Sequence, residues 1–297
     1  MKIGIAGMGK MGSAIAARLL GLGHQVIVWN RSPDRAQPVL AQGAAWAGTP
    51  GALASDADMV LTMLLDAAAL EAVYFGPDGL LSGAPRERLF VDMGTMSPGQ
   101  AQSMARRVRE AGAAYLECPV GGSVGPAKEG KLLGFVGGSA ADLSRARGVL
   151  DLLCRRVEHV GEAGAGATMK LAVNLPLMVY WQTLSEALSL LQPLGLDPSR
   201  VIDILAESSG GPNMLKVRGP MIAKALSGDA SGAVTVNVAT MRKDMHSMLD
   251  QAQALHYRLP LTALALATFE QAAAKGLDPA DCTQLPVWWL HEGGKAG

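Results

Sequence analysis

The chain has 297 residues, 26 basic and 26 acidic side chains, and an apolar fraction of 49%. That length exceeds the size at which a single core usually keeps growing, which favours two domains. There is no basic excess, no stripe of lysine and arginine, and no acidic tail, so the composition argues against a nucleic-acid partner and against a disordered arm. We therefore expect a small molecule as the partner.

Cysteine usage and the first residues bear on the compartment. Cys118, Cys154 and Cys282 follow no CxxC spacing, and their odd number leaves no complete disulfide framework, so reduced thiols are expected. A predicted strand follows Met1 directly, which leaves no room for a charged and apolar leader. The longest apolar stretches fall short of the roughly 20 residues that span a membrane. We expect a cytoplasmic protein with no membrane partner.

Residues 1–162 alternate short apolar strands with amphipathic helical segments, the pattern of a parallel sheet covered by helices. Helices are expected at 12–22 and 98–111, where Ala, Leu and Arg recur with a helical period. Strands are expected at 3–6, 25–29, 59–62, 89–91 and 115–117, and strands at 132–137 and 157–160 would extend the sheet. The first domain is therefore predicted to be an α/β Rossmann domain.

The pattern changes after Gly166 to helical segments separated by Gly and Pro, so residues 163–297 are predicted to form an all-α domain. A long helix is expected from 167 to about 194, and Pro176 should kink or interrupt its hydrogen-bond ladder. Another helix is expected to start at Asp197-Pro198. Further helical segments are expected at 201–206, 214–226, 238–255 and 262–275. Because no low-complexity linker is present, the long helix is expected to join the domains.

A GxGxxG motif lies between the first predicted strand and the helix that follows it. In that context the first glycine allows the turn, the second admits a pyrophosphate, and the third lets helix and strand pack closely. The helix N-terminus adds amide donors and a favourable dipole. The candidate cofactor-binding residues are Gly7, Met8, Gly9, Lys10, Met11 and Gly12. A glycine-rich turn that binds no cofactor is the alternative.

The end of the second predicted strand bears on which cofactor binds. NAD-preferring sites carry an acidic residue here for the ribose hydroxyl, whereas this chain has Asn30, Arg31 and Ser32. Those residues remove the carboxylate that would repel a ribose phosphate and offer a guanidinium and a hydroxyl to bind it. We therefore expect NADP, with NAD possible. The alternative is that Arg31 is a solvated loop charge and either cofactor serves.

Lys170 and Asn174 follow the small-residue segment 161–166 and stand four residues apart, which places them on one face of a helix. A primary amine at the end of a nicotinamide ring can pass a proton to or from an alcohol oxygen while hydride moves at the neighbouring carbon. Together with the dinucleotide-binding motif, the pair predicts a redox enzyme. The alternative is a lysine whose stem packs and whose ammonium is solvated.

Four segments resemble the β-hydroxyacid dehydrogenases, which include 3-hydroxyisobutyrate dehydrogenase, tartronate semialdehyde reductase and glyoxylate/succinic semialdehyde reductase. They are residues 7–12 (GMGKMG), 118–122 (CPVGG), 161–174, and Lys243-Asp244. The resemblance covers nearly the whole chain. It implies a Rossmann domain followed by a 6-phosphogluconate dehydrogenase-like helical domain, with the active site in the cleft. It also implies that the helical parts associate into a homodimer or homotetramer.

The resemblance further implies roles for individual residues. Lys170 would be the catalytic residue, and Asn174 would orient the substrate. Lys243 would close over the cofactor. The nicotinamide end of the cofactor would lie by Thr95 and by the loop Met63-Leu64-Leu65, and the acid group of the substrate would lie by Gly121, Gly122 and Ser123. Read alone, Lys243-Asp244 would be a solvated helix pair and Thr95 a helix cap.

The chain departs from the family at the substrate loop. The usual pattern is Asp-Ala-Pro-Val-Ser-Gly-Gly, whereas residues 117–123 read ECPVGGS. The serine hydroxyl is thus displaced to Ser123, which could restore the hydrogen bond from a new direction, or the amides of Gly121 and Gly122 could bind the carboxylate instead. Leu65 replaces a common proline, and Gly94 replaces a serine before Thr95. A standard 3-hydroxy acid substrate does not follow from this loop.

Together these features predict an NADP-preferring oxidoreductase. It would interconvert a small aldehyde or keto acid and its hydroxy acid by hydride transfer, with Lys170 as proton donor or acceptor and without a metal. One alternative is an imine reductase, a class with a similar fold that usually lacks the lysine at this position. The other is an NADP-binding protein without turnover.

Overall fold

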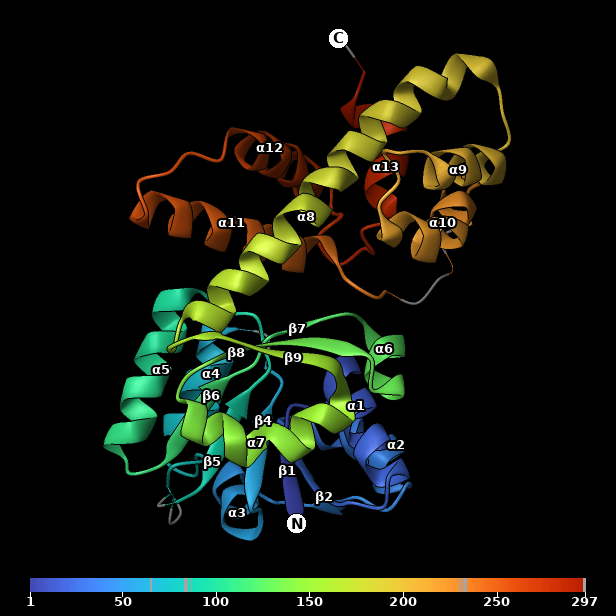
Figure 1. Cartoon of the computed structure of the whole chain (residues 1–297). Coiled ribbons are helices and arrows are strands. Elements are labelled where there is room, and N and C mark those ends of the chain that lie inside the picture. Colours follow the sequence, from blue (N-terminus) through green and yellow to red (C-terminus); the bar gives the residue numbers. More distant parts are fainter. Residues whose placement is uncertain (65, 83–84, 86, 230, 232–233, 296–297) are drawn as a thin grey trace. The chain divides into compact units, whose positions relative to one another are not determined.

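The computed structural model describes the chain apart from residues 65, 83–84, 86, 230, 232–233 and 296–297 (Figure 1). Contacts within the chain divide it into two compact units, residues 1–170 and residues 171–297. This division falls later than the predicted boundary because the start of the long helix α8 (Ala165–Leu191) is hydrogen-bonded to the end of a strand of the first unit. The domain limits 1–162 and 163–297 stay a prediction.

The first unit is built on a nine-stranded sheet in the order β3-β2-β1-β4-β5-β6-β8-β7, with β9 paired to β8. The strands are β1 (Lys2–Ala6), β2 (Gln25–Trp29), β3 (Ala45–Trp46), β4 (Met59–Thr62), β5 (Leu89–Asp92), β6 (Ala114–Glu117), β7 (Val120–Gly121), β8 (Leu132–Gly137) and β9 (Cys154–Gly161). Pairing is parallel from β3 to β6, as predicted. At the other edge β8 runs antiparallel to β6 and β7, because the short connection through α6 (Val124–Glu129) holds no full crossover helix.

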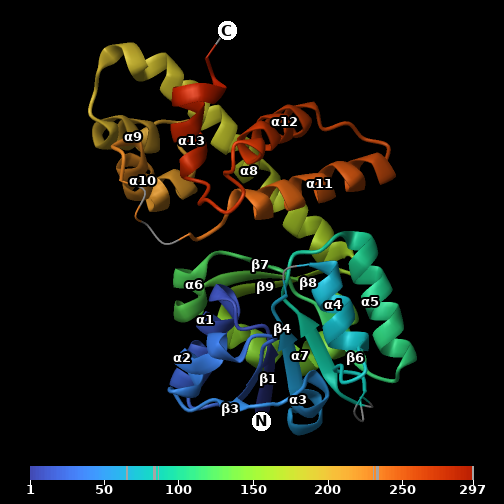
Figure 2. The ribbon, with the colours of Figure 1, turned by 180° about the vertical axis from the view of Figure 1, so that it is seen from behind.

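Helices cover both faces of this sheet (Figures 1 and 2). One face carries α1 (Lys10–Gly21) and α7 (Ala140–Leu153), and the other carries α3 (Pro50–Asp56), α4 (Ala67–Phe75) and α5 (Pro98–Glu110). Side chains along a strand alternate between the two apolar clusters; Ile3 and Ile5 belong to one, and Ala6 belongs to the other. Burial on both faces explains why the strands read as continuous apolar runs. The remaining helical segments are η1 (Pro33–Ala36) and α2 (Gln37–Leu40).

The described residues of the second unit form helices and contribute to no named strand. They are the continuation of α8, η2 (Gln192–Leu194), α9 (Pro198–Glu207), α10 (Asn213–Leu226), α11 (Val238–Ala254), α12 (Pro260–Ala274), α13 (Gln284–Trp288) and η3 (Trp289–Gly293). Asp197 caps α9 by accepting hydrogen bonds from the amides of Ser199 and Arg200, which confirms the predicted start. Among the described helices none is both long and apolar enough for a membrane crossing.

The structure assigns one continuous helix α8 from Ala165 to Leu191 with Pro176 inside it, so the proline does not end the helix (Figure 1). A proline removes one amide donor from the ladder, and packing on both sides of it can offset that loss. Leu171 before the proline and Met178 and Trp181 after it are all buried in the core of the second unit. The burial of this apolar face, rather than local propensity, therefore sustains the helix.

Candidate active site

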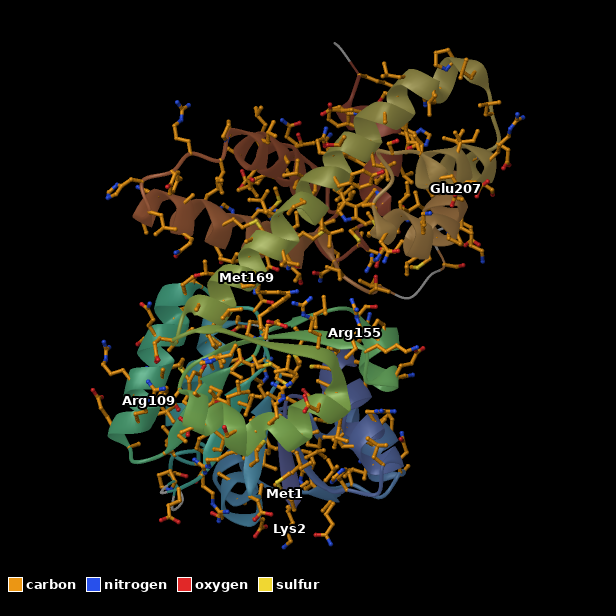
Figure 3. The ribbon with its side chains drawn as sticks, viewed as in Figure 1. Met1, Lys2, Arg109, Arg155, Met169 and Glu207 are labelled. Carbon is orange, nitrogen blue, oxygen red and sulfur yellow. The ribbon has the colours of Figure 1, made fainter. Side chains whose placement is uncertain are left out.

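A row of five residues crosses the carboxyl ends of the parallel strands β2, β1, β4, β5 and β6. In register they are Trp29, Ala6, Thr62, Asp92 and Glu117. Met1 and Lys2 mark the opposite end of the sheet, where β1 begins (Figure 3). The predicted cofactor residues that follow β1, β2, β4 and β5 begin within three positions of this row, so the topology gathers these loops at one edge. Such an edge is where open α/β sheets bind their ligands.

The glycine motif has the geometry that its three positions require. Gly7 has a φ of +104°, and its amide donates to the carbonyl of Trp29 at 2.9 Å. A Cβ at Gly7 would overlap the carbonyl of Met63, and one at Gly12 would overlap the carbonyl of Gly7. At Gly9, which precedes the first residue of α1, a Cβ would meet no atom within 4 Å. Gly7 and Gly12 are therefore packed tightly against neighbouring backbone, whereas the space beside Gly9 is open. That open space fits a pyrophosphate approaching the backbone.

Asn30 is hydrogen-bonded both to the glycine loop and to its own loop after β2. Its Oδ1 accepts the amide hydrogen of Met8 at 2.9 Å, and its Nδ2 donates to the carbonyl of Ser32 at 2.9 Å. Arg31 and Ser32 are exposed beyond it. An aspartate here could still accept from Met8 but would face the carbonyl of Ser32 with a second acceptor. The hydrogen bond between Asn30 and the amide of Met8 could not be predicted from the sequence.

The loops after β4 and β5 are held against each other. Met63 and Leu64 are partly buried, whereas the predicted Leu65 lies outside the described residues. A Cβ at Gly94 would come within 2.7 Å of the carbonyl of Leu64, which explains why glycine replaces the family's serine there. Ser97, and not Thr95, caps α5, through a capping box with Gln100. Thr95 is therefore not the helix cap that the alternative reading proposed.

Two buried carboxyl groups lie side by side in the row, and the sequence reasoning missed both. Asp92 accepts from the hydroxyl of Thr62 at 2.8 Å and from the amide of Gly94 at 2.8 Å. Burial raises the pKa of Asp92 to about 6 despite these hydrogen bonds. Burial, with a smaller contribution from the charge of Asp92, raises the pKa of Glu117 to about 7. The available signal was an acidic residue directly after the predicted strand 89–91 and another at the end of the predicted strand 115–117.

These two carboxyl groups predict a pH dependence of stability. Their folded pKa values lie above the unfolded ones, so their contribution is fully present below about pH 4 and is lost as pH rises through about 6 to 7. The loss is on the order of 3 to 6 kcal/mol for the pair. Urea unfolding between about pH 5 and about pH 8 should show this decline in the wild type and a flatter profile in Asp92→Asn/Glu117→Gln. Parallel profiles for the two proteins would contradict the assignment.

Lys170 lies in the second turn of α8, at the end of the first unit. Its side chain is buried, with 8% exposed. The start of the helix is fixed to the sheet edge, because Oε1 of Glu117 accepts the amides of Gly164 at 2.6 Å and Gly166 at 2.9 Å. The alternative of a lysine with a fully solvated head does not fit this burial.

The predicted substrate loop forms the turn from β7 into α6. Gly121 ends β7 and is partly buried, while Gly122 and Ser123 are exposed. Ser123 stands at the N-cap of α6 without making a side-chain cap hydrogen bond. Its hydroxyl is thus not used to cap the helix it precedes.

In the second unit Asp244 connects two of the predicted residues. This carboxylate is 4% exposed, lies 3.1 Å from the Nζ of Lys243 and accepts from the Nδ2 of Asn174 at 3.4 Å. Asn174 comes from α8 and the other two residues from α11. Asp244 is therefore a buried carboxylate that contacts two partly exposed side chains, so the pair Lys243-Asp244 is not fully solvated.

The three cysteines are part of the buried core. Cys118, Cys154 and Cys282 are buried free thiols, and burial raises the pKa of each. Within the described ranges no group of three or more His, Cys, Asp or Glu side chains is placed to hold a metal ion.

Known families match both parts of the chain. Residues 2–161 match the NAD-binding domain of 6-phosphogluconate dehydrogenase, and residues 164–288 match the NAD-binding domain of NADP-dependent 3-hydroxyisobutyrate dehydrogenase. The chain is 35% identical to a 3-hydroxyisobutyrate dehydrogenase of Pseudomonas aeruginosa, covering 95% of this chain and 97% of the relative. It is 32% identical to the 2-hydroxy-3-oxopropionate reductase of Escherichia coli, covering 96% of each.

Solved structures of other proteins are similar over nearly the whole chain. Psf3, solved in complex with NADP+ and 2-OPP, is 28% identical with a TM-score of 0.87, covering 96% of this chain and 99% of that one. An imine reductase of Streptomyces aurantiacus is 23% identical with a TM-score of 0.65, covering 96% and 98%, and shares the fold alone. The predicted fold class, a Rossmann domain followed by a helical domain, is confirmed. With its paired family matches and relatives of nearly full coverage, this chain belongs to the β-hydroxyacid dehydrogenases, the family of NAD(P)-dependent oxidoreductases that includes 3-hydroxyisobutyrate dehydrogenase.

Proposed function

We propose that the protein is an NADP-preferring reductase that interconverts a small aldehyde or keto acid and its hydroxy acid, with Lys170 as the proton donor and acceptor. The observation that carries this proposal is the burial of Lys170, a residue of the unit whose sheet edge also carries the glycine loop. An amine that is largely shielded from water can exchange a proton with a substrate oxygen beside it.

The residues of the sheet edge would hold the cofactor. The pyrophosphate would lie over Gly9 and the first turn of α1, where the open backbone fits it. Arg31 and Ser32 would bind a ribose phosphate, and Thr95 with Met63 and Leu64 would border the nicotinamide. The bound cofactor supplies or accepts the hydride at the carbon of the substrate.

The chain's own residues would handle the proton and the orientation of the substrate. In reduction, the Nζ of Lys170 donates a proton to the oxygen that becomes a hydroxyl; in oxidation, the neutral amine takes it back. Asn174, one turn further along α8, would hold a second polar group of the substrate, and Gly121, Gly122 and Ser123 would bind its acid group. Lys243 would reach the cofactor from α11. We also propose that the protein is a cytoplasmic homodimer or homotetramer.

One assay series tests the reaction class. A panel of aldehydes, keto acids, hydroxy acids and cyclic imines is assayed with NADP(H) and with NAD(H), following absorbance at the nicotinamide band. We expect turnover of a small oxo acid or aldehyde and its hydroxy acid, with kcat/KM higher for NADP(H). Turnover of cyclic imines alone would move the protein to the imine reductases. Cofactor binding without turnover of any panel member, and unchanged by Lys170→Ala, would favour the non-catalytic alternative.

A further inference from the structure

The carboxyl group of Glu117 lies in a site formed by backbone. Its side chain is fully buried, and Oε1 accepts the amides of Gly164 at 2.6 Å and Gly166 at 2.9 Å. The first amides of a helix have no partner within the helix, and a carboxylate there also interacts favourably with the helix dipole. A side chain from the end of β6 therefore ties the start of α8 to the sheet.

Two glycines line the carboxyl group of Glu117, and the one at Gly137 is required for it to fit. A Cβ at Gly137, the register partner of Glu117 on β8, would overlap Oε1. A Cβ at Gly166 would come within 3.2 Å of Oε1 and 2.5 Å of the carbonyl of Phe135. The family pattern has an aspartate at position 117, one methylene shorter. The longer side chain and the two glycines fit one another, which indicates a built contact.

We propose that Glu117 is a positioning residue, whose buried carboxyl group fixes the first turn of α8 and thereby the place of Lys170. This inference rests on the proposed role of Lys170. Lys170 follows Gly166 by one helical turn, so a shift of the anchored turn is carried along the helix to the amine. A misplacement of about 1 Å at a reacting group can lower a rate about 100-fold.

Two substitutions separate the contact from the charge. Glu117→Ala leaves both amides without their acceptor, and we expect kcat to fall about 100-fold while the Kd of NADP stays within about twofold. Glu117→Gln keeps an acceptor for the two amides, so it should restore most of the rate. Asp197→Ala is the matched control, because this exposed carboxylate also accepts two amides at a helix start, on α9. It should leave kcat unchanged.

A double-mutant cycle tests whether Glu117 acts through Lys170. If it does, adding Glu117→Ala to Lys170→Ala lowers the residual rate no further. The inference would be overturned if adding Glu117→Ala lowered the rate of Lys170→Ala by as large a factor as it lowers the rate of the wild type. A folded Glu117→Ala protein with wild-type kcat would overturn it too.

The anchor itself has a readout that needs no activity. In 15N-labelled wild-type protein, the amide resonances of Gly164 and Gly166 should shift with the titration of Glu117, whose pKa burial raises to about 7. The shift should be absent in Glu117→Gln and kept in Asp197→Ala. Resonances that titrate alike in wild type and Glu117→Gln would refute the anchor even where Glu117→Ala fails to fold. Full turnover by Lys170→Ala would instead overturn the proposed function and leave this spectral result standing.

Discussion

Replacing Lys170 with alanine is expected to lower kcat by 100-fold to 10,000-fold, the range that a positioned general acid or base contributes. The Kd of NADP should change little, because the glycine loop and residues 30–32 lie on other elements than α8. Pre-steady-state kinetics with the best substrate of the panel gives the hydride-transfer rate, and fluorescence titration gives the Kd. The loss should appear in kcat and kcat/KM together, since the proton is transferred only in the chemical step.

A matched lysine separates this effect from a general loss of charge. Lys275 is an exposed residue after α12, with 64% of its side chain exposed, and lies 3.8 Å from Glu292. Lys275→Ala should keep wild-type kcat. A Lys170→Ala enzyme that turns over at a rate near wild type would exclude the proposed proton role.

The second large effect is expected at Arg31. A charge-assisted hydrogen bond to a phosphate contributes about 1.5 to 3 kcal/mol, so Arg31→Ala should weaken NADP binding roughly 10-fold to 100-fold. NAD lacks the ribose phosphate, and its Kd should stay within about twofold. Parallel titrations with both cofactors measure the ratio. The NADP effect should also shrink at high salt, because Arg31 is exposed and its charge is screened there.

Arg109 provides the control for Arg31. It is an exposed arginine on α5, on the face of the sheet opposite to α1 (Figure 3). Arg109→Ala should leave the Kd of both cofactors unchanged. Equal losses of NADP and NAD in Arg31→Ala would remove the phosphate-binding role and would point to a disturbed loop around Asn30.

The amino-acid sequence by itself predicted the fold class, most strands of the first unit and the class of oxidoreductase, but not the short strands β3 and β7. Alternating apolar strands and helical periods predicted the Rossmann part, because buried strands and amphipathic helices leave direct periodic signals. The glycine motif could be recognised because turn, open backbone and close packing each require a missing side chain at a fixed spacing; the structure shows these at Gly7, Gly9 and Gly12. Lys170 and Asn174 could be paired because four residues make about one helical turn.

The tertiary structure alone decided which polar groups face one another. Asp92 and Glu117 lie 25 positions apart in the chain, and only strand pairing brings them together. Nothing local to Glu117 shows that it accepts the amides of Gly164 and Gly166, or that Asn30 braces Met8, because such contacts join segments through space. The passage of α8 through Pro176 has the same origin: local propensity opposes it, and the burial of side chains on both sides of the proline outweighs that propensity.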